Sequence, residues 1–368
     1  MLKTNKMDNV SLTRFKELLS IPSKTYQEEQ MIEYLSWVLE SIPGVDYYTD
    51  EMGNIYATKK EDNFNGYLPM FVAHTDTVHS LVPEIVVKEQ TLPKPPTFGR
   101  TFDDTQYNVL KAYTPEGNPT GIGGDDKCGI FICLELLRTL SNVKVGLFVS
   151  EETGCHGSRK CDVKFLNDVG YIVQYDAPGD HLITEICSGV RLFEGNGEFI
   201  NRALPVIESS MNTTMDLQSH PYTDVSQLKQ KADVSCINIS CGYYNMHTPN
   251  EFIVLDDVDK AIRTGINLVN EFGYEKQVYA YEAPKYSYGG LFNLEDAEDD
   301  LGDWDNTLLD GLDEFEETHT LNDNVVNFEW GGMTIQSKHT DEAVYLDEED
   351  VLELYELIRT RFLLKGVE

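Results

Sequence analysis

Basic residues are scarce in this chain. Its 368 residues include 29 lysines and arginines against 63 aspartates and glutamates, which gives a formal net charge of -34 at pH 7. Nucleic acids and anionic membranes are polyanions, and the proteins that bind them present clustered positive charge. We therefore expect neither a nucleic acid nor a membrane among the partners of this protein.

Long apolar runs are also missing. No stretch approaches the roughly 20 apolar residues of a membrane-spanning helix, and residues 1–9 lack the apolar core of a signal peptide. The 7 cysteines include no CxxC pair, and an odd number without a secretion signal favours reduced thiols packed in a core. These absences predict a cytoplasmic protein without a disulfide framework.

The remaining pattern is typical of an α/β protein. Strands are predicted over residues 54–59, 68–73, 144–149, 170–175 and 235–240, and helices over 12–20, 127–140 and 256–272, with a further amphipathic helix around 31–39. Because strands and helices alternate, we expect a doubly wound, mostly parallel sheet flanked by helices. In this architecture active sites lie at the carboxyl ends of the strands.

Short polar motifs predict where several helices begin. Ser11 is expected to cap the first helix. Thr25, with Glu28 three residues later, resembles a capping box for the second helix. Asp256 or Asp257 is expected to cap the last helix of this region.

Composition divides the chain into three parts. We expect a catalytic domain over residues 1–272, an acidic linker or flap over 273–324, and a small C-terminal strand–helix segment over 325–368. Within the first part, the proline-rich residues 80–124 indicate a surface excursion. Within the second, residues 293–323 are dense in acids and have no steady period, which is typical of a mobile segment. The predicted architecture is therefore an α/β domain followed by an acidic C-terminal extension.

Five short stretches carry residues with metal-ligand chemistry. They are His74-Thr75-Asp76, Asp125-Asp126-Lys127, Glu151-Glu152, Asp176 and His247. Each lies in or beside an apolar, strand-like run, so one edge of a sheet can present all of them. Imidazole and carboxylate ligands suit zinc, manganese or cobalt, and a carboxylate can bridge two cations. A two-metal hydrolase is therefore the leading hypothesis.

Two of these stretches indicate how the roles divide. His74 and Asp76 are two residues apart, so on a regular strand both side chains point to the same face. A metal-bound imidazole usually donates its second N–H group to a carboxylate, and we assign Asp76 to that task. Glu151 and Glu152 end an apolar strand, where one carboxylate can bind metal while its neighbour reaches the reacting water.

The sequence resembles the co-catalytic zinc peptidase family that includes peptidase T, tripeptide aminopeptidase, carnosinase and acetylornithine deacetylase. The resemblance extends from about Val10 to Phe272 and includes, in the family order, the motifs FKELLSIPSKTYQEEQMIEYL, DEMGNIYAT, AHTDTV, GGDDKCG, EETG, YDAPG and MHTPNEF. Single motifs of this kind are common, but seven in order are specific.

The resemblance implies a role for each candidate residue. Asp125 would bridge two divalent cations, most simply Zn²⁺ with Co²⁺ or Mn²⁺ as alternatives; His74 and Asp176 would complete one site, and Glu152 and His247 the other. Glu151 would be the general acid/base in hydrolysis by metal-activated water. A cis peptide bond between Asp125 and Asp126 is also expected.

The chain departs from the family in one respect. Peptidase T and its relatives insert a lid and dimerisation domain between the fourth ligand and the last histidine, and residues 177–246 are too few to hold both that domain and the last strands of the sheet. The lid is therefore expected to be absent or reduced, and the oligomeric state stays open. His220 and Arg191 are candidates for binding substrate, and Thr223-Asp224 resembles a pair near the site of related aminopeptidases.

Three functions remain open from the sequence. The first is an aminopeptidase that cleaves short peptides, such as a di- or tripeptidase. The second is a deacylase of N-acyl amino acids, because the same metals and the same glutamate cleave both kinds of amide. The third is a non-catalytic acidic interaction protein on a peptidase scaffold. The full set of ligands and the retained Glu151 favour an enzyme.

Overall fold

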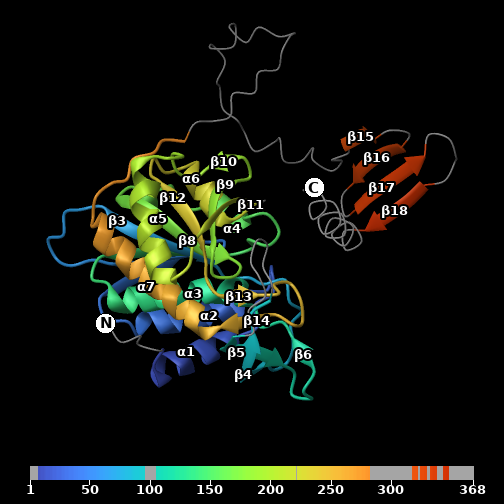
Figure 1. Ribbon diagram of the computed structural model, residues 1–368, viewed down its shortest axis with the longest axis horizontal. Coiled ribbons are helices and arrows are strands. Elements are labelled where there is room, and N and C mark those ends of the chain that lie inside the picture. The colour runs from blue at the N-terminus through green and yellow to red at the C-terminus, as the bar shows by residue number, and fades with distance from the viewer. Residues whose placement is uncertain are drawn as a thin grey trace, which may run out of the picture. The chain divides into compact units, whose positions relative to one another are not determined.

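The chain divides into two compact units. A computed structural model describes residues 7–95, 105–220 and 222–281, together with four strands between residues 317 and 347. The first unit is Met1–Lys285 and the second is Tyr286–Glu368 (Figure 1). No helix within the described ranges is long and apolar enough to cross a membrane.

The described part of the second unit is an antiparallel sheet in the order β15-β16-β17-β18. These strands are Glu317–Leu321, Asn324–Glu329, Gly332–Ser337 and Ala343–Asp347. β15 lies inside residues 273–324, the stretch expected to be an acidic linker, of which residues 282–316 and 322–323 lie outside the described residues. A C-terminal helix is predicted over residues 347–364; Asp347 is the last residue of β18, and the rest of this range lies outside the described residues.

Nine strands form the main sheet of the first unit. Their order is β1-β2-β7-β3-β8-β12-β9-β10, and β11 pairs with β9. The strands are β1 (Val45–Thr49), β2 (Ile55–Lys59), β3 (Leu68–His74), β7 (Val143–Phe148), β8 (Val169–Ala177), β9 (Leu182–Cys187), β10 (Val190–Arg191), β11 (Asp216–His220) and β12 (Cys236–Ser240).

The four middle strands, β7, β3, β8 and β12, are parallel to one another. β1, β2 and β9 extend the sheet in antiparallel fashion. Every residue of the four middle strands is buried, which explains their nearly continuous apolar sequences. The predicted fold class, an α/β domain with a mostly parallel central sheet between helices, is confirmed.

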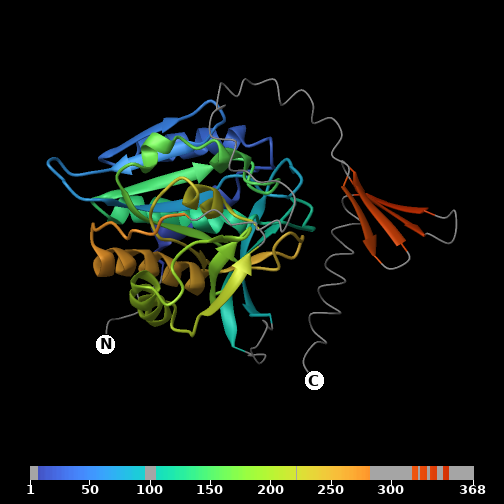
Figure 2. The same ribbon diagram turned by 90° about the horizontal axis from the view of Figure 1, so that it is seen from above.

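Helices cover both faces of this sheet. Adjacent residues of β8 point to opposite faces of the sheet. Tyr175 faces α7, because a Cβ added at Gly265 of α7 would lie 2.8 Å from the Tyr175 hydroxyl. Gln174 faces α6, because its side-chain oxygen accepts a hydrogen bond from the N–H of Val225 at 2.6 Å. α3 and α5 pack against α7, and α4 packs against α6 (Figures 1 and 2). The helices are α1 (Asn9–Leu19), α2 (Glu29–Glu40), α3 (Gly124–Thr139), α4 (His156–Arg159), α5 (Glu198–Met211), α6 (Asp224–Lys229) and α7 (Leu255–Phe272).

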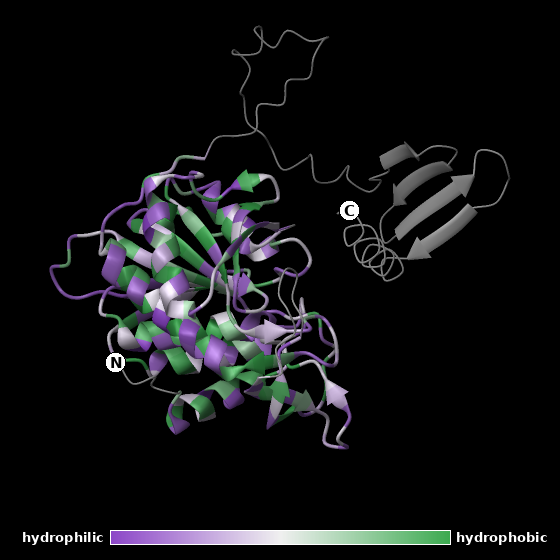
Figure 3. Cartoon of the chain, viewed as in Figure 1, coloured by the Kyte–Doolittle hydropathy of each residue, from purple (hydrophilic) through white to green (hydrophobic). Residues whose placement is uncertain are grey.

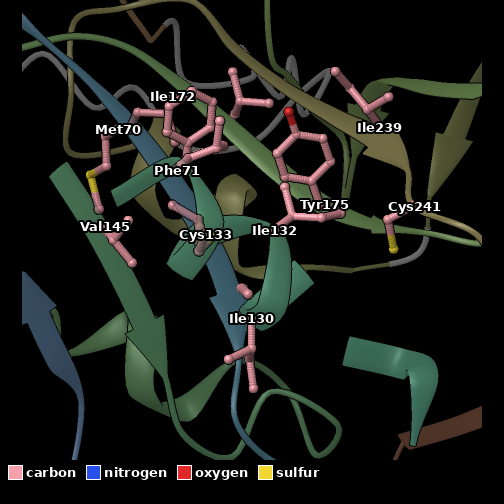
Figure 4. Packing of buried hydrophobic residues seen from close by; sticks show 14 of the residues in the cluster. Met70, Phe71, Ile130, Ile132, Cys133, Val145, Ile172, Tyr175, Ile239 and Cys241 are labelled. Carbon is pink, nitrogen blue, oxygen red and sulfur yellow. The ribbon is translucent and has the colours of Figure 1, made fainter. Parts of the chain in front are cut away.

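The apolar core lies between α3 and the parallel strands. Figure 4 shows Met70, Phe71 and Val145 of the sheet packed near Ile132 and Cys133 of α3, all of them buried. Hydrophobic residues gather on the strands and on the inner faces of the helices, while polar residues lie on the outer helix faces (Figure 3). This core supports the strand ends that carry the candidate site.

A second, smaller sheet adjoins the first unit's main sheet. It has the order β13-β14-β5-β4, with β6 paired to β5. Its strands are β4 (Val86–Pro93), β5 (Gln106–Tyr113), β6 (Pro119–Thr120), β13 (Tyr243–Tyr244) and β14 (Phe252–Val254). Residues 80–124, expected as a surface excursion, thus supply three strands, and β14 joins them to the chain that follows His247.

Two of the expected helix caps are wrong. α1 is capped by Asp8, whose carboxylate accepts a hydrogen bond from the N–H of Ser11 at 2.7 Å, so Ser11 lies inside the first turn. α2 begins after Glu28, but the Glu28 side chain makes no capping bond, and Thr25 donates elsewhere. Both side chains of the expected capping box reach the candidate site instead.

The expected cap of α7 is also wrong. The N-cap position is Val254, and Asp256 and Asp257 lie within the first turn. Acidic side chains in a first turn are still favourable there, because they interact with the positive end of the helix dipole. The sequence therefore places the acids correctly at the helix start but misplaces the cap by two or three residues.

We expect Phe131→Ala to lower the free energy of unfolding by about 3–5 kcal/mol, because it leaves a cavity in the core. Phe131 of α3 is buried and stacks on Phe15 of α1 with ring centroids 4.2 Å apart, so it joins two helices. Trp37→Ala is the matched control, since Trp37 is 62% exposed. Urea unfolding of both variants checks the difference, and equal losses would contradict this account of the core.

Candidate metal centre

The candidate residues meet at the carboxyl ends of the parallel strands. His74 is the last residue of β3, Glu151 and Glu152 follow β7, and Asp176 lies near the end of β8. Asp125 and His247 come from other elements: Asp125 lies at the start of α3, and His247 lies in the loop between β13 and β14. The structure thus brings all five expected ligands and the expected base into one site.

Asp125 lies between the two histidines and offers one oxygen to each. Its Oδ1 is 3.1 Å from His74 Nε2, and its Oδ2 is 3.2 Å from His247 Nε2. Asp176 Oδ1 is 3.6 Å from His74 Nε2, whereas Glu152 Oε2 is 3.2 Å from His247 Nε2. Contacts therefore divide the residues into a His74 group and a His247 group that share Asp125.

The donor set fits divalent metal ions. One potential ligand atom from each of His74, Glu151 and Asp176 lies within 4.8 Å of the others, and so do atoms of His74, Asp125 and Glu152. The second of these sets contains both Glu152 and His74, but Glu152 Oε2 is 3.2 Å from His247 Nε2, so we assign Glu152 to the His247 group. Glu152 Oε1 is buried and has no hydrogen-bond partner within the described ranges, which leaves it available to a cation.

Burial and neighbouring acids act on the protonation of these groups. Burial raises the pKa of Glu152 to about 7, and the charge of Asp125 adds to this effect. Burial also raises the pKa of Glu151 well above its usual value, against the opposing charge of His74. Burial opposes the charge of Asp125 as well, but hydrogen bonds from His247 and His74 lower its pKa. Positive charge at this centre would relieve the repulsion among the carboxylates.

The Asp125–Asp126 peptide bond is cis, as the family resemblance implied. Regular helical geometry begins only after Asp126. The buried carboxylate of Asp126 accepts hydrogen bonds from the N–H of His74 at 3.2 Å and of Gly129 at 3.0 Å. A Cβ at Gly129 would lie 2.4 Å from Asp126 Oδ1, so only glycine leaves room for this contact.

Asp76 has more partners than the sequence indicated. Its carboxylate is 3.4 Å from His74 Nδ1, which is closer to the main-chain oxygen of Asp76, at 3.0 Å. The same carboxylate accepts hydrogen bonds from the N–H groups of Glu151 at 2.9 Å and Glu152 at 3.2 Å, and from the Thr25 hydroxyl at 2.9 Å. It therefore also fixes the main chain that carries the two glutamates.

Sequence reasoning missed the contacts of Glu28. Its buried carboxylate accepts hydrogen bonds from the N–H and the hydroxyl of Ser150, each at 3.1 Å. Ser150 has a left-handed φ of 52° and begins the turn into Glu151. Local sequence gives no signal for this contact, because the Thr25–Glu28 spacing equally suits a capping box.

Asp176 is surrounded by hydrogen-bond donors. Its N–H donates to Asn238 Oδ1 at 2.8 Å, and its carboxylate accepts from the hydroxyls of Thr223 at 2.6 Å and Tyr243 at 3.3 Å. Thr223 thus lies near the site, as expected from the resemblance. These donors stabilise a carboxylate whose pKa is raised by burial and by the charge of Asp125.

The two candidate substrate-binding residues differ in position. His220 ends β11, and its Nδ1 donates a hydrogen bond to the main-chain oxygen of Tyr222 at 2.7 Å. The hydroxyl of Tyr222 donates to the main-chain oxygen of Glu152 at 2.9 Å. His220 is therefore beside the site. Arg191 forms an ion pair with Glu185 across the β9–β10 hairpin, so its guanidinium already has a carboxylate partner.

The sequence matches no protein-family model and no curated protein. Its structure is similar to that of aminopeptidase PepT from Bacillus cereus, with a TM-score of 0.56, 15% identity, and coverage of 71% of this chain and 97% of that one. It is also similar to a tripeptidase from Staphylococcus aureus, with a TM-score of 0.51, 15% identity, and coverage of 70% and 96%. A TET aminopeptidase from a thaumarchaeon gives a TM-score of 0.50 at 14% identity, with coverage of 71% and 96%. The predicted resemblance to peptidase T and tripeptidases is confirmed for the fold.

Residues 177–246 form no separate lid. They supply β9, β10, α5, β11, α6, β12 and β13, with residue 221 alone outside the described ranges, and most of these strands belong to the main sheet. The expectation that the lid is absent or reduced is confirmed for the described residues.

We expect metal removal to destabilise the protein. A chelator followed by dialysis should lower the Tm, and Zn²⁺ should restore it, because an ion that binds only the folded state stabilises it by about 2.7 kcal/mol at a hundred times its Kd. Mg²⁺ should restore less, since imidazole ligands suit zinc better. Differential scanning calorimetry with metal analysis checks this, and an unchanged Tm would contradict metal binding at the site.

Proposed function

We propose that the protein is a zinc-dependent hydrolase that removes N-terminal residues from short peptides. One observation carries the proposal: a single buried carboxylate, Asp125, gives one oxygen to each of two histidine-containing groups, with Glu151 beside them. This arrangement suits two cations that share one ligand. The fold shared with aminopeptidase PepT supports the same reading.

In the proposed site, five residues hold the metals. His74, Asp176 and Asp125 would hold one ion, and Asp125, Glu152 and His247 the other. When bound, such ions supply Lewis acidity toward a carbonyl oxygen and lower the pKa of water. Zinc is the proposed metal because the set combines imidazole nitrogens with carboxylate oxygens.

Glu151 is the proposed general acid/base. Its Oε2 is 3.9 Å from His74 Nε2, and only 4% of the residue is exposed. A buried carboxylate with a raised pKa accepts a proton from the attacking water and returns it to the leaving amine without competition from bulk solvent. Asp76 and Glu28 hold the main chain on either side of this residue, which keeps the carboxylate in place.

The charge around the site favours a substrate with a free amine. Within the described ranges, hydrogen bonds to the side chains of Asp125, Glu151, Glu152 and Asp176 come from histidine, hydroxyl, amide or thiol groups. A deacylase must bind the carboxylate of an N-acyl amino acid, for which arginine is the usual partner. An acidic site is better suited to the α-ammonium group of a peptide.

We expect Glu151→Gln to retain both metals and lose about a hundredfold to ten-thousandfold in kcat, because it removes proton transfer but none of the proposed ligands. Glu29→Gln, an exposed glutamate at the start of α2, is the control and should keep full activity. Metal analysis and steady-state kinetics with di- and tripeptides check this. Activity within a few fold of wild type would show that Glu151 is not the base.

A substrate comparison separates the aminopeptidase from the deacylase. We expect free di- and tripeptides to be cleaved with a kcat/KM at least tenfold above that of their N-acetylated forms and of N-acyl amino acids. The physical reason is the acidic surroundings of the site, which repel a substrate that lacks the α-ammonium group. Faster cleavage of N-acyl amino acids would favour the deacylase, and no cleavage of any of these substrates would contradict both enzyme functions.

A further inference from the structure

Glu251 is a fully buried carboxylate outside the proposed ligand set. It lies four residues after His247 and directly before β14. Its Oε1 accepts a hydrogen bond from the N–H of Asp125 at 3.0 Å, and its Oε2 accepts one from the N–H of Gly123 at 2.8 Å. His79 Nε2 lies 2.7 Å from the same Oε2. Three groups therefore share the two oxygens.

Such a carboxylate is costly to bury unless its oxygens are hydrogen-bonded. Here the donors are two main-chain N–H groups and an imidazole that is itself mostly buried, with 16% of its side chain exposed. Charge-assisted hydrogen bonds of this kind are shorter and stronger than neutral ones. Loss of the Glu251 charge would leave the N–H of Asp125 or of Gly123 without its acceptor.

The neighbouring glycines leave room for this contact. Gly123 has a left-handed φ of 65°, and a Cβ at Gly124 would lie 3.2 Å from Glu251 Oε1. At Gly121 a Cβ would lie 2.1 Å from the ring of His79, so the imidazole can approach only a glycine there. The chain that leads into Asp125 is thus built to receive both the carboxylate and the imidazole.

Glu251 also belongs to the loop of the last histidine. Its N–H donates to the main-chain oxygen of Thr248 at 3.1 Å, which closes the turn that follows His247. β14 begins at the next residue and pairs with β5. The Glu251 side chain therefore connects the His247 loop to the start of α3, and across this connection Asp125 Oδ2 and His247 Nε2 are 3.2 Å apart.

We propose that Glu251, held by His79, is a positioning residue that fixes the carboxylate of Asp125 relative to His247. It contacts neither the proposed metals nor the substrate, and it acts through the main chain of Asp125. By fixing this pair it sets the affinity of the His247 group for its cation. The inference rests on the proposed two-metal site but not on the identity of the substrate.

Metal titration of three variants tests this proposal. Glu251→Gln should weaken binding of one of two Zn²⁺ ions by about ten- to a hundredfold, the usual effect of changing a group that orients a ligand. His79→Leu, which keeps the carboxylate but removes one donor, should weaken the same ion about tenfold. His79→Gln, whose amide can donate in place of the imidazole, should stay within about threefold of wild type. Isothermal titration calorimetry of the metal-stripped full-length chain measures each affinity.

A matched control separates positioning from general destabilisation. Asp257 is also fully buried, bound by Lys94 at 2.8 Å and by the Tyr244 hydroxyl at 2.8 Å, and it makes no contact with the Asp125 main chain. Asp257→Asn should lower the Tm but leave both Zn²⁺ affinities unchanged. The visible spectrum of the Co²⁺-loaded protein should change with Glu251→Gln and His79→Leu, and not with Asp257→Asn.

Several outcomes would overturn the proposal. These are unchanged Zn²⁺ affinities in both Glu251→Gln and His79→Leu, an equal loss in His79→Gln and His79→Leu, an equal loss of affinity in Asp257→Asn, or a wild-type protein that binds no second ion. If Glu251→Gln does not fold, the two His79 variants decide. Wild-type protein that binds two ions but cleaves no peptide would refute the proposed function and leave this inference standing.

Discussion

The candidate site depends on one kind of interaction: a buried side-chain oxygen that accepts the main-chain N–H of a site residue. Asp126 accepts from His74, Glu251 from Asp125, Asp76 from both Glu151 and Glu152, and Asn238 from Asp176. Where a strand or helix ends, the main-chain N–H groups lose their regular partners and must find others. Here the acceptors come from different elements, so each bond ties two parts of the site together.

This arrangement makes the position of each proposed ligand a property of the fold. The main-chain N–H groups of Asp125 and Glu152 are held by hydrogen bonds to other elements. The main chain at these two residues therefore stays in place whichever rotamer their side chains adopt. His247 differs from the others: 43% of its side chain is exposed and its φ is 61°. The turn that follows His247 is closed by Glu251, so the proposed role of that glutamate concerns this last proposed ligand.

This arrangement is electrostatically unfavourable without a bound cation. Many acids lie close together with little positive charge from the chain itself, and burial raises the pKa values of Glu152 and Asp224 to about 7. Most of the acceptors that hold the main chain are themselves carboxylates, so the framework adds to the negative potential that the ligands already create. That potential attracts cations, and a metal bound there would be linked to the stability of the folded chain.

The sequence predicted the parts of this site that depend on local pattern. Apolar runs located the four parallel strands, and ordered motifs located His74, Asp125, Glu151, Glu152, Asp176 and His247, which the structure brings together. The contacts of Thr25 and Glu28 were not predictable, because their spacing suits a capping box equally well, whereas their observed partners are Asp76 and Ser150. Those partners are remote in the sequence, and only the packed sheet brings them near.

The smaller sheet was not predicted because its strands also pair with residues that are remote in the sequence. Residues 80–124 contain many turn-forming residues, which indicated a surface excursion with a hairpin-like end and not a sheet; β5 is stabilised by pairing with β14, which follows much later in the chain. This pairing holds the strand that follows the His247 loop, and His79, which precedes β4, lies 2.7 Å from Glu251 at the end of that loop. A region without any proposed ligand therefore contributes to the candidate site, because the loop that carries His247 is otherwise flanked only by the short paired strands β13 and β14.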